Sequence, residues 1–150
     1  MRVVIQRVKN ASVIINNETR REIGKGYLIL LGIENSDTID DIEWLCGKIS
    51  KIRLFTDDHG LMNKSISEVQ GNVLLISQFT LYASTKKGNR PSFTKAAQPN
   101  IAIPLYKEFI HKLETMLRKP IETGEFGAQM EVSLINDGPV TLTIDTKNKE

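Results

Sequence analysis

The sequence predicts an α+β fold in which two main helices pack on a mostly antiparallel, barrel-like β-sheet. Strand-like runs gather at both ends of the 150-residue chain, and two segments between them carry apolar residues at helical spacing. Strands and helices therefore come in blocks without regular alternation, which is typical of α+β proteins. No repeat or linker divides the chain, so we expect one domain over residues 1–150 with a frayed tail at 146–150.

Four strand-like runs occupy the first 35 residues. Each is rich in aliphatic and β-branched residues, and short pairs containing lysine, asparagine or glycine separate them. This pattern predicts a meander whose fourth strand, the most apolar, is buried. The four runs are residues 2–8, 11–17, 19–24 and 26–34.

An amphipathic helix is expected next. Apolar residues recur at helical spacing from Ile39 to Ile52, and acidic residues stand near its start, where the helix dipole favours them. Asp37 or Ser36 is the expected N-cap. We expect this helix to lie on the sheet.

The rest of the chain predicts further strands around a second helix. That helix is expected from Pro99 or Ile101 to Leu117, with Leu105, Phe109, Leu113 and Met116 facing the core. A turn is expected at "TDDHG" (56–60), and no state is assigned to 65–69. The expected strands are residues 52–55, 72–82, 121–126, 129–135 and 140–145.

Composition excludes several classes of function. The chain is 40% hydrophobic and 25% charged, with a net charge of +2, which is ordinary for a soluble protein and does not demand a nucleic-acid partner. The single Cys46 rules out an internal disulfide and a multi-cysteine zinc site. With no long apolar run and no signal-like N-terminus, we expect a cytoplasmic protein that does not enter a membrane.

One basic cluster stands out, in "TKKGNRPSFTK". Lys86, Lys87, Arg90 and Lys95 surround a glycine and a proline, with Phe93 among them. Short charge runs are most often solvated surface, and that interpretation stays open. The same make-up suits a loop that contacts phosphates.

Familiar catalytic and metal-binding patterns are missing. His59 lies in an expected turn and His111 among charged residues on the second helix, so neither is placed to activate a nucleophile. No phosphate-binding loop or dinucleotide fingerprint occurs. We therefore predict no cofactor and no metal site.

The stretch "SQFTLYAST" interrupts an apolar strand with small polar side chains. In a regular strand Ser77 and Phe79 would share one face, and Gln78 and Thr80 the other. Polar groups in a buried strand cost free energy unless something satisfies them. The pattern indicates either a strand that leaves the core or a functional site.

A second unusual stretch, "NDGPVT", places Gly138 and Pro139 between two strand-like runs. Each residue weakens a strand, so a turn is the simplest interpretation. The alternative is a working backbone, because an X-Pro bond is readily cis and glycine accepts unusual dihedrals. Arg7, on the same face as Val3 and Ile5, also needs a specific partner, for which backbone carbonyls are suitable.

Together these motifs resemble the D-aminoacyl-tRNA deacylases of the D-tyrosyl-tRNA deacylase type. The similarity runs from "MRVVIQRV" through "SQFTLYA" and "KKGNRPSF" to "NDGPVT", and it covers nearly the whole chain to about Asp145. It rests on the S-Q-x-x-L motif of Ser77, Gln78 and Leu81 and on the N-x-x-P-x-T motif. Asn89 departs from the basic residue that the family leads us to expect.

The resemblance implies a chiral proofreading hydrolase. Family members are homodimers in which a cis Gly-Pro, here Gly138-Pro139, enters the partner's site, and its carbonyls exclude L-amino acids while D-amino acids and glycine fit. Their substrate is the ester between the amino acid and the terminal adenosine of tRNA. The site residues that it implies are Ser77, Gln78, Phe79 and Thr80 for catalysis and Arg7, Leu81, Lys86, Lys87, Arg90, Met130, Asn136, Gly138, Pro139, Val140 and Thr141 for substrate binding.

The resemblance leaves the chemistry of cleavage open. Groups around Ser77, Gln78 and Phe79 would hold the ester carbonyl. Thr80 is the candidate nucleophile, but the sequence offers no histidine to activate it. We therefore expect the 2′-hydroxyl of the terminal adenosine to assist. The competing hypotheses are a non-catalytic tRNA- or DNA-binding module and a purely structural dimer.

Overall fold

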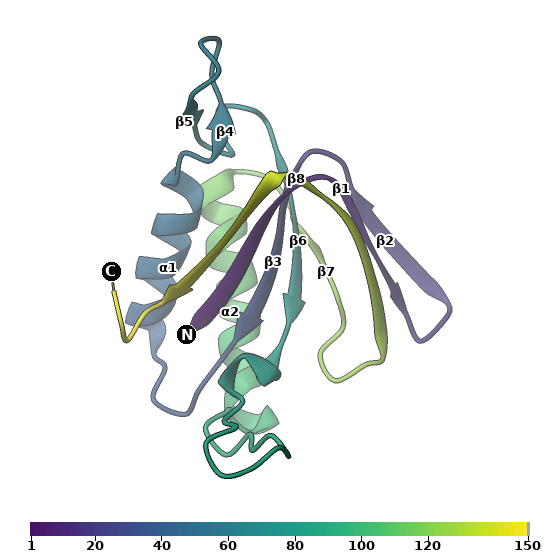
Figure 1. Cartoon of the computed structure of the whole chain (residues 1–150), viewed down its shortest axis with the longest axis vertical. Helices are drawn as coiled ribbons and strands as arrows, with labels where there is room; N and C mark the ends of the chain where they lie inside the picture. The colour runs from purple at the N-terminus through teal and green to yellow at the C-terminus, as the bar shows by residue number, and fades with distance from the viewer. Residues whose placement is uncertain (150) are drawn as a thin grey trace.

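A bent six-stranded sheet with two helices on one side forms the protein (Figure 1). This computed structural model describes residues 1–149. The strands are β1 (Arg2–Ile15), β2 (Thr19–Ile23), β3 (Gly26–Gly32), β6 (Asn72–Ser77), β7 (Glu122–Thr123) and β8 (Met130–Asp145). A separate hairpin consists of β4 (Phe55–Thr56) and β5 (Met62–Lys64), and the helices are α1 (Ile39–Lys51), the 3₁₀ helix η1 (Phe79–Tyr82) and α2 (Pro99–Leu117).

The expected α+β class is confirmed, with a mixed sheet. The strand order is β2-β1-β3-β6-β7, and β8 pairs with β1. β1 pairs antiparallel with β2, β3 and β8, whereas β3 with β6 and β6 with β7 run parallel. The crossovers through α1 and α2 produce these parallel pairs, which the sequence pattern of a meander did not reveal.

Several expected strands merge or shorten. The expected strands 2–8 and 11–17 merge into β1, which ends at Ile15 and whose pairing with β8 shifts register near Val8 and Asn10. The expected strands 129–135 and 140–145 likewise merge into β8, which begins at Met130. In residues 121–126 only Glu122–Thr123 is strand, and the expected strand 72–82 ends at Ser77. Because a bulge keeps a strand paired while inserting residues, polar and glycine-containing breaks need not end it.

The core consists of two apolar clusters. One lies between the sheet and the helices and includes Tyr27 and Phe55, whose rings stack at 5.1 Å, and Phe109 of α2. The other fills the curved part of the sheet, where Val13 and Leu74 are fully buried. Cys46 is buried on α1, and burial raises the pKa of its thiol to about 12. A thiol in that environment is not a nucleophile.

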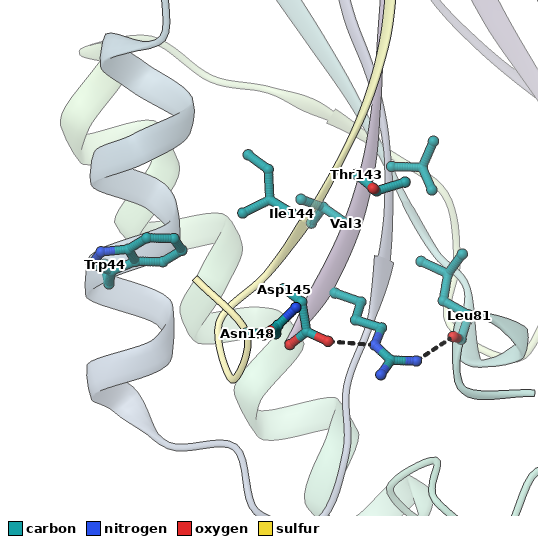
Figure 2. Close-up of a pocket in the computed structure, with 9 residues that line it drawn as sticks. Val3, Trp44, Leu81, Thr143, Ile144, Asp145 and Asn148 are labelled. Carbon is teal, nitrogen blue, oxygen red and sulfur yellow. Dashed lines mark hydrogen bonds and ion pairs between the residues drawn. The ribbon is translucent and has the colours of Figure 1, made fainter. Parts of the chain in front are cut away.

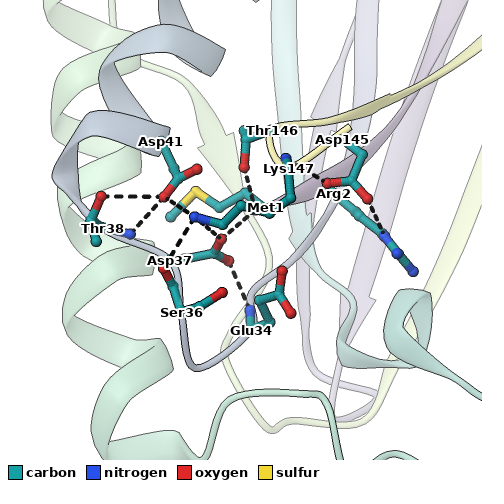
Figure 3. A network of polar contacts seen from close by, with 10 residues as sticks. All are labelled: Met1, Arg2, Glu34, Ser36, Asp37, Thr38, Asp41, Asp145, Thr146 and Lys147. Carbon is teal, nitrogen blue, oxygen red and sulfur yellow. Dashed lines mark hydrogen bonds and ion pairs between the residues drawn. The ribbon is translucent and has the colours of Figure 1, made fainter. Parts of the chain in front are cut away.

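Thr146 and Lys147, which begin the tail expected to fray at 146–150, instead dock on the start of α1 (Figure 3). Glu150, also part of that expectation, lies outside the described residues. Thr146 is 5% exposed, and its hydroxyl accepts a hydrogen bond from the Met1 amino group. The Met1 amino group also binds Asp37, and Lys147 binds the carboxylate of Asp41 at 2.8 Å.

The N-cap of α1 differs from the expectation. It is Thr38, whose backbone N–H donates to Asp41 at 2.8 Å. Asp37 instead accepts hydrogen bonds from Met1 and from the Glu34 amide. Among residues 1–149, no helix has the length and apolarity needed to cross a membrane.

Candidate active site

The S-Q-x-x-L stretch lies where β6 ends and turns into η1. The Gln78 amide still donates to the Leu31 carbonyl at 2.7 Å, and the chain then coils over β3. Gly32 permits this packing, because a Cβ there would stand 3.0 Å from the Cβ of Leu81 and 3.1 Å from the Gln78 carbonyl. The alternating faces expected for Ser77 to Thr80 are therefore wrong beyond Ser77, since no strand continues.

This turn brings four expected catalytic residues together. The Gln78 side-chain amide donates to the Thr80 hydroxyl. Phe79 is 55% exposed and packs edge-on against Phe93, with ring centroids 5.1 Å apart. Ser77, Gln78 and Phe79 line a small pocket of about 80 Å³. Its other walls are Leu31, Ile33, Ala97, Ala102, Phe126 and Gly127.

The basic loop begins beside this turn. Ser84 and Ser92 exchange backbone hydrogen bonds of 2.8 and 2.9 Å and close the loop that carries Lys86, Lys87 and Arg90. These three side chains are exposed, and the Phe79–Phe93 contact joins the loop to the pocket rim. The loop that carries these three cations is thus in contact with the S-Q-x-x-L turn through Phe93.

The N-x-x-P-x-T stretch forms a bulge in β8. Asn136 pairs with Val8 and Thr141 pairs with Gln6, so residues 137–140 stand opposite Arg7 alone. The Gly138–Pro139 peptide bond is cis, and Gly138 has a φ of +124°. Both residues are exposed. The bulge is therefore exposed to its surroundings, and at Gly138 it presents backbone alone.

Arg7 anchors this bulge from beneath. It is 8% exposed, and its Nε donates to the Asp137 carbonyl at 3.2 Å and lies 3.3 Å from the Asp137 carboxylate. Its Nη1 donates to the Leu54 carbonyl. The prediction that backbone carbonyls partner Arg7 is confirmed, and the ion pair with Asp137 adds to it.

Asn136 and Thr141 close the base of the bulge. The Asn136 amide donates to the carbonyls of Arg7 and Val140, both at 3.1 Å. The Thr141 hydroxyl donates to the Asn136 Oδ1 and accepts from Gln6, each at 3.5 Å. The asparagine and threonine of the motif therefore hold the loop's shape.

Two further expected residues lie apart from the bulge. Met130, at the start of β8, is partly buried, and its sulfur would stand 2.5 Å from a Cβ at Gly124, next to the Ile76 side chain. Leu81 lies on η1, and its carbonyl accepts from Arg2 at 3.2 Å. Met130 thus flanks β6 just before Ser77.

The two motifs lie at opposite ends of the sheet within one chain. Tyr27 pairs with both Arg7 and Val73, whereas Leu31 pairs with Val3 and Ser77. The bulge is thus level with the start of β6 and Ser77 with its end, roughly 13 Å away along the strand. Three strand spacings also separate β8 from β6, which brings the total to roughly 20 Å.

Sequence reasoning missed Phe126 and Gln6. Phe126 was assigned to a strand, but it forms a wall of the pocket just before Gly127, whose φ is +78°. Gln6 carried no visible signal, because its role depends on its register opposite Thr141. His59 and His111 are both exposed, and residues 1–149 contain no cluster of side chains that could hold a metal ion.

Comparison with known proteins finds relatives that match the full length of the chain. A D-aminoacyl-tRNA deacylase from Bacteroides fragilis is 61% identical over 100% of both chains, and one from Parabacteroides distasonis is 55% identical over the same extent. A solved structure of the c-Myc DNA Unwinding Element Binding Protein is 39% identical and covers 97% of this chain and 98% of its own, with a TM-score of 0.91.

A more distant structure shares the fold. A probable eukaryotic D-amino acid tRNA deacylase, 18% identical, has a TM-score of 0.82 and covers 95% of this chain and 97% of its own. The family model described as D-Tyr-tRNA(Tyr) deacylase matches residues 4–145. This match and the full-length identity to curated relatives show that the chain belongs to the D-Tyr-tRNA(Tyr) deacylase family.

Proposed function

We propose that this protein hydrolyses the ester bond of D-aminoacyl-tRNA and so returns mischarged tRNA to use. The observation that carries the proposal is the exposed bulge at Gly138–Pro139, which Arg7 and Asn136 hold from below. A backbone element fixed in this way has no evident task in a purely structural protein. Curated relatives of this chain are named D-aminoacyl-tRNA deacylases, which supports the proposal.

The site is assembled between two copies of the chain. The bulge and the pocket beside Ser77 lie roughly 20 Å apart along and across the sheet, so one chain cannot place both on the same amino acid. A two-fold dimer brings two different patches together twice, which gives two equivalent sites. In each, Gly138–Pro139 of one protomer faces Gln78 and Phe79 of its partner.

Chirality is read at the α-carbon by the backbone. The carbonyls of the bulge accept hydrogen bonds from the substrate amino group, and an L side chain would clash with the bulge. A D side chain points away, and glycine has no side chain to exclude, so both are accepted. Because the selector contacts no side chain of the substrate, the enzyme accepts D-amino acids of different types.

Cleavage relies on positioning and on the substrate's own hydroxyl. The first N–H groups of η1, at Phe79 and Thr80, have no acceptors within that helix and can hold the developing oxyanion. Thr80 already accepts a hydrogen bond from Gln78, and neither exposed histidine forms a hydrogen bond with it among the described residues. The 2′-hydroxyl of the terminal adenosine therefore helps to activate water.

The basic loop contacts the phosphates of the tRNA end. Lys86, Lys87 and Arg90 are exposed beside the pocket rim and form no ion pair within residues 1–149. Because its substrate is charged tRNA, we place the protein in the cytoplasm.

A second candidate function is nucleic-acid binding without catalysis. The relative of known structure that is 39% identical is named as a DNA unwinding element binding protein, and the basic loop suits either nucleic acid. This alternative leaves the shape of the Gly138 bulge unused, so deacylation is the stronger proposal.

A paired hydrolysis assay tests the proposal. Release of amino acid from D-Tyr-tRNA and L-Tyr-tRNA is measured, together with D-Tyr-tRNA ending in 2′-deoxyadenosine. We expect cleavage of the D-ester alone and at least a 100-fold loss on the deoxy substrate. Cleavage of neither ester, with tRNA still bound, would favour the binding module. Full-rate cleavage of the deoxy substrate would refute assistance by the 2′-hydroxyl.

A further inference from the structure

A groove leads away from the S-Q-x-x-L turn and is separate from the pocket beside Ser77. It has a volume of about 330 Å³, with Leu81 at one end and Trp44 of α1 at the other (Figure 2). Its floor is formed by Val3 and Ile144. Arg2 lies near the Leu81 end and donates to both the Leu81 carbonyl at 3.2 Å and Asp145 at 2.7 Å.

A second hollow continues this groove along α1. It has a volume of about 650 Å³ and shares Trp44 and Ile144 with the first, so the two meet at that pair. Lys48, Lys51 and Arg53 line its far end. The continuous surface runs from the S-Q-x-x-L turn, across the indole of Trp44, to three cations.

The charge of this groove is positive. Lys48, Lys51 and Arg53 have no carboxylate within ion-pair distance in residues 1–149. The two acidic residues that line the groove are already neutralised, Asp145 by Arg2 at 2.7 Å and Glu43 by Lys112 at 2.6 Å. Arg53 donates a hydrogen bond to the Asn63 side chain at 3.0 Å, which leaves its positive charge uncompensated. The charges of the three cations therefore remain available to an anionic partner.

The aromatic ring stands among these cations. The ammonium of Lys149 lies 4.6 Å from the centroid of Trp44 and that of Lys48 lies 5.6 Å away. An aromatic face flanked by lysines is the usual make-up of a surface for single-stranded nucleic acid, in which bases stack and phosphates bind the cations. A stacked base would replace Lys149 on the ring, and the freed ammonium would meet the adjacent phosphate.

We propose that the groove from Leu81 across Trp44 to Lys48, Lys51 and Arg53 binds the unpaired acceptor end of tRNA and its adjoining phosphates. The inference rests on the proposed function, because it uses the S-Q-x-x-L turn as the place where the terminal adenosine sits. A second copy of the chain docked patch to patch is disfavoured, since the lysines would face each other.

The test compares a substrate long enough to reach the groove with a substrate too short to reach it. The double variant Lys48→Ala/Lys51→Ala is compared with Arg20→Ala/Lys107→Ala, which removes the same charge from exposed positions on β2 and α2. Two substrates are used, D-Tyr-tRNA and the short ester D-tyrosyl-adenosine. Binding of uncharged tRNA is measured in parallel against salt concentration.

We expect the groove variant to weaken tRNA binding about 10-fold and to raise KM for D-Tyr-tRNA to a similar degree. Its kcat/KM for D-tyrosyl-adenosine should stay within about 2-fold of wild type. The slope of log Kd against log salt should fall by about 1 to 2, because about 0.7 counterions are released per phosphate contacted. A Trp44→Leu variant should weaken tRNA binding about 10-fold, whereas Trp44→Phe should retain it.

Equal tRNA binding by the groove variant and the control variant would overturn the inference. So would an equal loss on D-Tyr-tRNA and D-tyrosyl-adenosine, because that result places the effect at the ester. If wild type cleaves neither ester while the groove variant still binds tRNA more weakly than the control variant, the proposed hydrolysis is wrong. The proposal that the groove binds tRNA is then retained.

Discussion

The substitution Gly138→Ala tests the bulge most directly. A Cβ on Gly138 would stand 2.9 Å from the Arg7 Nη2, 3.0 Å from the Val140 Cγ2 and 3.2 Å from the Val140 amide nitrogen. Gly138 also has a φ of +124°, which alanine adopts only at a cost of about 1–3 kcal/mol. The arginine that would have to move is mostly buried and holds the loop through the Asp137 carbonyl. The loop itself must therefore shift.

A shift of about 1 Å in a positioning element typically lowers the rate about 100-fold. We expect kcat/KM for D-Tyr-tRNA to fall by that factor, with about 1–3 kcal/mol lost from the free energy of unfolding in urea. Gly60→Ala is the matched control, since Gly60 has a φ of +82° but no atom within 4 Å of its Cβ position. It should lose about 1 kcal/mol of stability and no activity. Wild-type activity in folded Gly138→Ala would refute the role of the bulge.

Three further outcomes follow from the same contacts. Thr80→Ala should keep more than about a tenth of the wild-type activity on D-Tyr-tRNA. A loss above roughly 10⁴-fold, as expected when a nucleophile is removed, would instead identify Thr80 as the attacking group. Gln6→Ala should lower kcat/KM about 3- to 10-fold with little change in Tm, because it removes only the hydrogen bond to Thr141. An unchanged kcat/KM would show that Gln6 does not support the bulge. Asp41→Asn should cost about 1–3 kcal/mol at pH 7, measured by urea unfolding. Burial raises the pKa of Asp41, but hydrogen bonds from Lys147, Thr146 and Thr38 outweigh it and hold the pKa well below its ordinary value of 3.8. The Asp41 carboxylate thus stabilises the fold at pH values above 3.8. The difference in the free energy of unfolding between wild type and Asp41→Asn should therefore shrink as the pH falls below about 4. A difference that does not depend on pH would contradict this account.

Local patterns of the sequence predicted the helices well. The spacing of Ile42, Leu45 and Ile49 placed α1, and all three are fully buried. The pattern could not predict that β3 and β6 run parallel, because two strands of the same composition pair in either direction until the crossover between them is known. It also could not predict the end of β6 at Ser77, which depends on the absence of a side chain at Gly32 on a neighbouring strand.

The docking of the C-terminus shows the same limit. Thr146 and Lys147 are polar residues near a chain end, and such sequences ordinarily stay solvated. Their order comes from partners at the other end of the chain, since Thr146 binds Met1 and Lys147 binds Asp41 (Figure 3). A pattern confined to neighbouring residues carries no information about such contacts.

The candidate site was easier to predict residue by residue than as an arrangement. Polar residues in an apolar strand and a Gly-Pro pair within a strand are visible locally, because both raise the free energy of an ordinary sheet. Their relative position is a property of register, and register places the Gly138 bulge level with Val73 while Ser77 is level with Val3. The S-Q-x-x-L turn and the Gly138 bulge lie at opposite ends of one sheet. They can therefore act on the same substrate only if each site takes its turn from one chain and its bulge from a second chain. The same separation makes the proposed dimer testable, since a mixed dimer of one Gly138→Ala protomer and one protomer altered at Gln78 should contain one intact site of two.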